Sequence, residues 1–179
     1  MRRYIVVVLF SLLFLSACMP TRATLDNTNK KSTKVADENF IRYRSKHPDS
    51  SRLADMTLEL SKMHFDAGEY LLSDFYAKTY LSDYGYMKNA DKAYYMHIKS
   101  LYARFRSNPS SDELAKQIKS DCKSFVSTFP KSRYKSSVRK ISKDTTVTIK
   151  AKNEEIAKEY ERLGKQKAAE FYRNKNRSL

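Results

Sequence analysis

The segment GEYLLSDFY at residues 68–76 recurs as GKQKAAEFY at residues 164–172. Both copies begin with a glycine and end with a Phe-Tyr pair, and the two glycines lie 96 residues apart (164 − 68). Glycine ends helices readily because it adopts the left-handed backbone conformation without steric cost. The repeated segment therefore predicts the same turn into an aromatic-bearing helix at two places in the chain.

A second repeated element also indicates a structure that repeats along the chain. A ring side chain directly precedes Pro or Gly at positions 47, 84 and 129, which are 37 (84 − 47) and 45 (129 − 84) residues apart. Helix pairs repeating at such intervals form solenoids, because one pair cannot bury its apolar face until a neighbour stacks on it. We therefore predict an all-α chain, an α-solenoid of about three stacked helix pairs.

The composition agrees with this fold and excludes others. The chain has 179 residues, of which only three are Gly and four are Pro, and it contains no Trp. This length allows one ordinary domain and is too short for a two-domain enzyme. Phosphate loops and dinucleotide fingerprints need several glycines at fixed spacing, and no such motif is present.

Periodicity and breakers together predict the helices. In the predicted helices 70–83 and 87–106, apolar residues recur at i, i+3 and i+4 spacing, which is typical of a stripe that faces the core. We expect one stripe at Leu72, Phe75, Tyr76, Thr79, Tyr80 and Tyr84, and another at Tyr94, Ile98, Leu101 and Phe105. The predicted helices span residues 36–45, 52–66, 70–83, 87–106, 112–128, 135–162 and 166–177.

The β-branched stretch 144–149 lies inside the longest predicted helix, 135–162. Intrinsic propensity disfavours β-branched residues in a helix by a few tenths of a kcal/mol each. We expect helix here, with a bend, a hinge or a loop as the alternatives.

The N-terminus has the pattern of an export signal. Arg2 and Arg3 precede an apolar run over residues 4–15, whose twelve residues (15 − 4 + 1) rise about 18 Å as a helix, too little for a hydrocarbon core of about 30 Å. The sequence Leu-Ser-Ala-Cys at residues 15–18 resembles a bacterial lipobox. That resemblance implies that Cys18 becomes the lipidated N-terminus, and several acyl chains anchor a protein without a spanning helix.

These features divide the chain into three parts. We expect a lipoprotein signal peptide at residues 1–17, a lipidated cysteine with a flexible Thr- and Asn-rich linker at 18–33, and a helical repeat domain at 34–179. Since Cys18 is used for lipid attachment, Cys122 has no disulfide partner. By similarity to enteric lipoproteins, Met19 in place of Asp favours the outer membrane.

Two segments carry a resemblance to tetratricopeptide repeats, at residues 66–70 and 127–130. More specifically, Phe-Val-Ser-Thr-Phe-Pro-Lys-Ser-Arg-Tyr at 125–134, the segment 155–160 before Gly164, and the segment 90–95 resemble the BamD (ComL) family. These are tetratricopeptide-repeat lipoproteins of the machine that assembles outer-membrane β-barrel proteins. The resemblance covers residues 40–177, and the family usually has five repeats, more than this chain carries.

The resemblance implies a function in binding, with no cofactor. The protein would be a lipid-anchored scaffold at the outer membrane, facing the periplasm, with BamA-like assembly subunits and unfolded outer-membrane proteins as partners. On the predicted helix 87–106, Tyr95, Lys99, Tyr102 and Arg106 form a stripe beside the core stripe. Tyr and Arg combine apolar area with directed hydrogen bonds, so this stripe is our candidate peptide-binding groove. The alternative for these four residues is packing between helices.

Motifs for catalysis and metal binding are lacking in the sequence. His47, His64 and His97 have no partner at i+4, and the chain has neither a C-x-x-C nor a G-x-S-x-G motif. Isolated helical histidines are more often solvated or capping residues than ligands, so we expect no catalytic residue, no metal and no enzyme activity. The competing function is that of a pilot or adaptor lipoprotein in another envelope machine, such as a secretion or pilus system.

Charge is distributed unevenly along the chain. Residues 18–113 carry 15 basic and 13 acidic side chains, a net +2, whereas residues 114–179 carry 18 and 7, a net +11. One interpretation is a solvated Lys-rich surface. The other is that this half docks on an acidic partner domain or on anionic lipid headgroups. Nucleic acid is a poor candidate, because the basic residues follow no recognition motif.

Overall fold

The computed structural model describes residues 22–177, and these residues form seven helices without a strand. The predicted all-α fold is confirmed. The signal segment and the lipobox Cys18 lie outside the described residues. The helices are α2 (Arg22–Lys46), α3 (Arg52–Asp66), α4 (Tyr70–Tyr84), α5 (Ala90–Ser107), α6 (Asp112–Thr128), α7 (Lys135–Arg162) and α8 (Gln166–Arg177).

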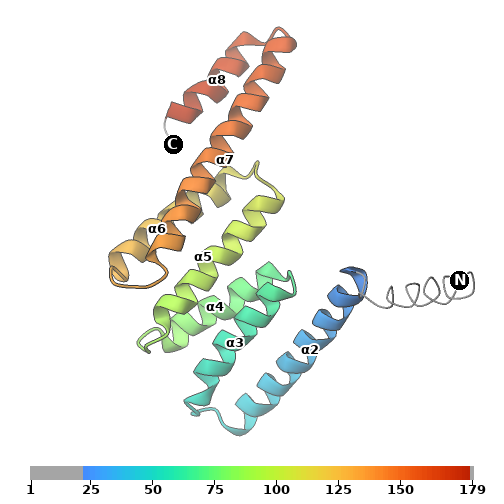
Figure 1. Cartoon of the computed structure of the whole chain (residues 1–179), viewed down its shortest axis with the longest axis vertical. Coiled ribbons are helices and arrows are strands. Elements are labelled where there is room, and N and C mark those ends of the chain that lie inside the picture. Colours follow the sequence, from blue (N-terminus) through green and yellow to red (C-terminus); the bar gives the residue numbers. More distant parts are fainter. Residues whose placement is uncertain (1–21, 178–179) are drawn as a thin grey trace, which may run out of the picture.

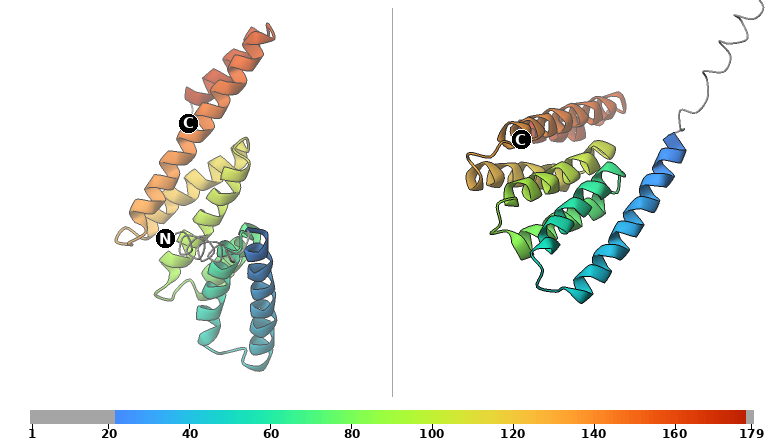
Figure 2. Two further views of the ribbon diagram at one scale, coloured as in Figure 1. Left: turned by 45° about the vertical axis from the view of Figure 1, so that its right-hand side comes forward. Right: turned by 60° about the horizontal axis from the view of Figure 1, so that its bottom comes forward.

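Three helix pairs stack in chain order, as the sequence predicts. Each helix packs on the next one, and α5 also contacts both α3 and α7 (Figure 1). The right-hand view of Figure 2 shows the resulting layers, from α2 through the α3–α4 and α5–α6 pairs to the α7–α8 hairpin. The first helices of the three pairs, α3, α5 and α7, are therefore neighbours along one face of the stack.

The two copies of the repeated segment form the same turn. Gly68 and Gly164 have φ of 77° and 71°, in the left-handed region. The next residue in each copy donates its backbone N–H to the carbonyl five residues earlier, from Glu69 to His64 and from Lys165 to Tyr160, both at 2.8 Å. This is the Schellman arrangement that caps a helix C-terminus. The sequence repeat thus reflects a structural repeat.

The core of the stack consists of three clusters of buried residues. One cluster joins α5, α6 and α7, and two smaller clusters join α2, α3, α4 and the start of α5. The predicted stripe on α5 is confirmed, because Ile98, Leu101 and Phe105 are fully buried and Tyr94 packs against them.

The predicted stripe on α4 is wrong at two positions. Leu72 and Phe75 are 44% and 58% exposed, whereas the small residues Ser73 and Ala77 are buried. Ser73 lies at a close helix crossing, where its carbonyl accepts a hydrogen bond from Ser61 on α3 at 2.9 Å and its hydroxyl accepts one from Ser100 on α5 at 2.8 Å. The close crossing at Ser73 leaves room only for a small side chain there, whereas Tyr76 and Tyr80 of the predicted stripe are buried as expected.

Helix α2 begins earlier than predicted. The expected flexible linker extends to residue 33, but the structure is helical from Arg22. No Gly or Pro occurs between residues 21 and 47, so nothing interrupts the helix that Phe40 anchors in the core. Thr33, within the expected linker, is already buried.

The long helix α7 is continuous through the β-branched stretch. Thr145 and Ile149 are buried against the core, which outweighs their modest helix propensity. The hydroxyl of Thr145 is buried without a hydrogen-bond partner among the described residues. In the part of the chain that the structure covers, no helix has the length and apolar character needed to cross a membrane.

Candidate peptide-binding surface

The four predicted groove residues lie on the face of α5 between α3 and α7. Two of them contact side chains from these neighbouring helices, Lys99 on the α3 side and Tyr95 on the α7 side. The structure therefore extends the predicted stripe into a surface shared by three helices. We call it the α3–α5–α7 row and define it as Phe65, Tyr95, Lys99, Tyr102, Arg106 and Tyr134.

Tyr95 stacks on Tyr134, the residue immediately before α7. The ring centroids are 4.6 Å apart and the planes differ by 11°. Tyr134 also accepts a hydrogen bond from the Arg133 guanidinium at 2.6 Å. Both residues are half-buried and also pack against the α5–α6–α7 core. The packing alternative therefore holds in part for Tyr95, which is both a contact between helices and a surface residue.

Lys99 lies over the ring of Phe65 at the end of α3. Its Nζ is 3.9 Å from the ring centroid, within the range of a cation–π interaction. Phe65 in turn packs against Tyr70, with centroids 5.2 Å apart. The ammonium group is thus held in place on an aromatic platform, and its side chain remains partly exposed.

The remaining two predicted residues differ from each other. Tyr102 is half-buried and packs against the α5–α6–α7 core, whereas Arg106 is exposed near the end of α5. Along α5, the half-buried tyrosines of the row therefore alternate with the cations Lys99 and Arg106. An extended peptide with aromatic and acidic groups is the ligand that such a surface suits.

Phe65 and Tyr134 are members of the row that the sequence reasoning did not assign. Phe65 directly precedes the repeat-like segment 66–70, and Tyr134 ends the segment 125–134. Their distance from α5 in sequence hid the contact. The solenoid order could have revealed it, because consecutive first helices of the pairs are neighbours.

Two histidines are part of buried networks, which corrects the expectation that they are solvated or capping residues. His64 is buried on α3, with Nδ1 2.7 Å from Glu69 Oε2 and Nε2 3.0 Å from Asp37 Oδ1. Asp37 also accepts a hydrogen bond from the Tyr76 hydroxyl at 2.7 Å. This network joins α2, α3 and α4.

The second network joins α4, α5 and α6 around His97. Its Nδ1 is hydrogen-bonded to Asp74, and its Nε2 lies 3.1 Å from Asp121 Oδ2. A carboxylate only accepts hydrogen bonds, so both bonds can form together only when the imidazole carries two protons. Each of the two histidines thus connects carboxylates from neighbouring elements across the stack.

Charge and burial act against each other at His97. Burial opposes the imidazolium form, but the hydrogen bonds and charges of Asp121 and Asp74 outweigh it and raise the pKa of His97 above its ordinary value. Burial likewise opposes ionised Asp74, yet His97 and Lys78 lower the pKa of Asp74 below its ordinary value. Within residues 22–177, no cluster of three or more potential ligands could hold a metal ion.

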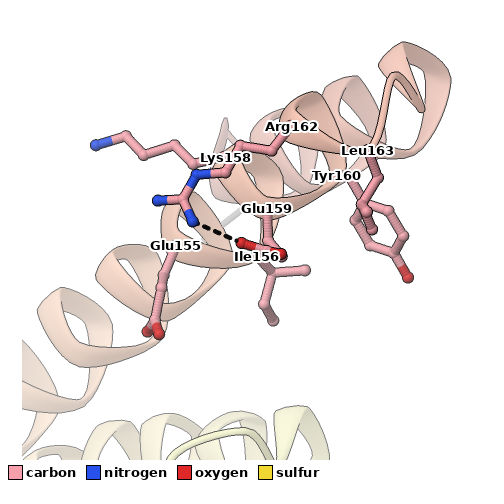
Figure 3. Close-up of a pocket in the computed structure, with 7 residues that line it drawn as sticks. All are labelled: Glu155, Ile156, Lys158, Glu159, Tyr160, Arg162 and Leu163. Carbon is pink, nitrogen blue, oxygen red and sulfur yellow. Dashed lines mark hydrogen bonds and ion pairs between the residues drawn. The ribbon is translucent and has the colours of Figure 1, made fainter.

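A separate hollow of about 590 Å³ lies along the last turns of α7 (Figure 3). Its lining comes from that helix alone and includes Ile156, Tyr160 and Leu163 beside charged residues. Arg162 forms an ion pair with Glu159 at 3.0 Å across it. None of the predicted groove residues contributes to this hollow.

Comparison with known proteins identifies similar sequences over most of the chain. The YfiO family model, described as outer membrane lipoprotein, matches residues 22–174. The outer membrane protein assembly factor BamD of Helicobacter pylori is 24% identical over 139 residues, which is 78% of this chain. The aligned part spans 63% of the length of that relative.

Proposed function

The chain belongs to the YfiO family of outer membrane lipoproteins, and from this premise we propose that it is a scaffold in the assembly of outer-membrane β-barrel proteins. Its localisation follows from the family: it is a lipid-anchored outer-membrane protein that faces the periplasm. The similar Helicobacter pylori protein is an outer membrane protein assembly factor. The proposed role is binding, without a reaction centre.

In our proposal, three parts of the chain have different tasks. Residues 1–17 direct export and are removed, Cys18 carries the lipid, and the helical domain projects from the membrane. The helical domain then includes α2 from Arg22 on, because α2 is continuous with the residues that pack in the core. Replacement of Cys18 with Ser should move the protein from the membrane fraction to the soluble periplasmic fraction.

The α3–α5–α7 row is the proposed client-binding surface. The observation that carries this proposal is the contact of Tyr95 with Tyr134 and of Lys99 with Phe65, which fixes aromatic and cationic groups from three helices on one face. A surface ordered before binding loses little conformational entropy when it captures an unfolded segment. Aromatic side chains of the client would pack on the tyrosines, and its acidic groups would pair with Lys99 and Arg106.

Charge reversal on the row tests the client site. We expect Lys99→Glu with Arg106→Glu to weaken binding of an aromatic, acidic segment of an unfolded β-barrel protein by about tenfold or more, since each replacement exchanges attraction for repulsion. The measurement is fluorescence anisotropy with the full-length protein in mild detergent. Lys116→Glu with Lys123→Glu is the matched control, because it changes the net charge equally at exposed positions of α6.

Equal weakening by the two double variants would contradict the assignment of the row and leave only a general charge effect. Partner subunits are tested separately by copurification of the lipidated protein. Recovery of a BamA-like barrel-inserting subunit supports the assembly role. Recovery of secretion or pilus components alone would replace it with the adaptor function.

A further inference from the structure

The outer face of α7 carries four exposed cations between residues 139 and 150. Arg139, Lys140, Lys143 and Lys150 are all exposed, and none has a carboxylate partner among the described residues. The later turns of the same helix differ, because Lys152 pairs with Glu155 at 2.9 Å and Arg162 with Glu159 at 3.0 Å. The positive charge between residues 139 and 150 is therefore available to a partner.

The four cations lie opposite the buried side of the helix. Val138, Ile141, Thr145 and Ile149 face the core, and at about 100° per residue the four basic residues fall on the other side. Val147 lies among them and is 58% exposed. From Arg139 to Lys150 the row extends about 17 Å, at 1.5 Å per residue. We call these five residues the basic face of α7.

The basic face belongs to the last layer of the stack. In the right-hand view of Figure 2, α7 and α8 form the outermost layer, and the N-terminal end of α2 rises toward the same side. Helix α8 packs on the later turns of α7 and reaches Lys150, whose carbonyl accepts a hydrogen bond from Asn176 at 3.1 Å, while the side chains of the basic face are exposed. A flat surface can therefore approach the basic face without meeting another layer first.

We propose that the basic face of α7 lies against anionic phospholipid headgroups of the membrane that holds the lipid anchor. The family places this protein at a membrane, so a lipid surface is tethered to the domain at high effective concentration. Four basic side chains without acidic partners, on a straight helix at the edge of the molecule, match a planar array of phosphates. This inference goes beyond client binding and does not depend on the α3–α5–α7 row.

The lipid surface fits the observations better than an acidic protein does. A protein interface of high affinity centres on buried apolar or aromatic anchors, and the basic face offers only Val147. Attraction to headgroups needs no such pocket, because each basic residue near an anionic surface favours the docked state about fivefold. The attraction acts within a Debye length and is therefore sensitive to salt.

The test measures the distance between α7 and the lipid surface. The lipidated full-length protein with Val147→Cys is labelled with a fluorophore and inserted into vesicles that contain a headgroup-labelled energy acceptor. Burial raises the pKa of the Cys122 thiol to about 12, so this native cysteine stays protonated and does not compete for the label. Ser82→Cys on α4 provides an exposed reference position.

We expect strong energy transfer from position 147 in vesicles of phosphatidylcholine with about one third phosphatidylglycerol, and weak transfer in phosphatidylcholine alone. The signal should disappear at about 1 M salt, where the Debye length is about 3 Å. Position 82 should not respond to lipid charge.

A quadruple variant, Arg139→Gln, Lys140→Gln, Lys143→Gln and Lys150→Gln, should lower the ratio of docked to undocked protein at least about tenfold. The matched control removes four exposed cations from α2, the α4–α5 turn and α6, namely Lys46, Lys88, Lys116 and Lys123, each replaced with Gln. The control should retain the signal.

Three outcomes would overturn the proposal. The first is transfer from position 147 that does not depend on lipid charge, and the second is an equal loss of signal in the two quadruple variants. The third is crosslinking of position 147 to an acidic protein in cells without any lipid-dependent transfer. The quadruple variant should still bind the client segment. Its loss of lipid docking can therefore be told apart from a failure of the proposed function.

Discussion

The stack from α2 to α6 and the α7–α8 hairpin are built from the same turn but held together differently. In the stack, aromatic rings and the His64 and His97 networks are buried between helices. In the hairpin, α8 buries only Ala169, and its contacts with α7 include polar pairs, among them the buried Asn153 with Asn176, and the stacked rings of Tyr160 and Tyr172, 5.7 Å apart. A helical repeat thus needs a neighbour on each side to build a full core. The stack should open only on global unfolding, and the hairpin should open locally.

The largest effect is expected from loss of a core ring in the stack. Phe125 is fully buried and contacts the rings of Tyr94 and Phe129, with centroids 5.7 and 5.4 Å away. Phe125→Ala should lower the free energy of unfolding by about 3–5 kcal/mol, because it removes apolar area and leaves a cavity. Phe171→Ala on α8, where the ring is 62% exposed, is the comparison in the hairpin and should change stability little. Urea titration measures both, and equal effects would contradict the comparison.

The His97 network should make the stack sensitive to pH. The pKa of His97 is raised in the folded state, so its contribution is complete below its unfolded value of 6.5 and is lost as pH rises through the folded value. The lowered pKa of Asp74 acts in the other direction, since its contribution is present above 3.8 and is lost as pH falls. His97→Gln removes the cation that Asp74 and Asp121 share, leaving Asp74 with the more exposed Lys78 at 3.4 Å, and should cost about 3 kcal/mol near pH 6.

The measurement is the free energy of unfolding between about pH 5 and pH 9. Wild-type protein should lose stability as pH rises above 6.5, and the His97→Gln variant should lose this slope. His47→Gln is the control, because His47 is exposed and its only recorded contact among rings is with Tyr43. A slope that persists in His97→Gln would assign the pH dependence to other groups.

The glycine turns allow a direct comparison of the two regions. Gly68 and Gly164 both have positive φ, and an added Cβ would meet no atom within 4 Å at either position. Replacement with Ala should therefore cost about 1–2 kcal/mol at both sites through backbone strain alone. Hydrogen exchange should locate the effect differently. Gly164→Ala should reduce protection in α8 only, whereas Gly68→Ala should reduce it throughout the stack, and the same pattern for both would contradict local opening of the hairpin.

The smallest effect is expected from the ion pairs of the hairpin. The Arg173 guanidinium lies 2.9 Å from Glu161 Oε2 and 3.4 Å from Glu154 Oε1, at the surface. Arg173→Gln should speed exchange of α8 amides slightly at low salt and leave the stack unchanged, because water and ions screen exposed pairs. Arg177→Gln is the control, since Arg177 forms no ion pair within residues 22–177. A salt-independent effect would indicate lost packing of the Arg173 side chain instead.

Sequence reasoning predicted the fold well because its signals were local. The turn glycines, the breakers and the α5 stripe each depend on residues within a few positions, and they located the helices to within about three residues except at α2. The exposure of Leu72 and Phe75 on α4 was not predictable in this way. Its buried face follows from the tight crossing at Ser73, which depends on Ser61 and Ser100 from other helices.

The candidate site was predictable only in part, because contacts between helices distant in sequence leave no local signal. The stripe on α5 was readable from spacing, but Phe65 and Tyr134 join it through packing of helices distant in sequence. The two histidines looked isolated because their partners come from other elements, 27 residues away for Asp37 and 23 for Asp74. Lipidation of Cys18 and the division of the chain at residue 33 stay predictions. For the division, the structure shows only that α2 is helical from Arg22.

Helix α7 is one long unbroken rod whose two ends have different surroundings. Its 28 residues extend about 42 Å, with the base at Tyr134 wedged beside α5 and the far end free of the stack. The core holds α7 as far as Ile149, so a tilt of about 5° there would move the end of the helix, about 20 Å further along, by about 2 Å. The helix contains neither Gly nor Pro, so it has no kink of that kind to absorb the movement.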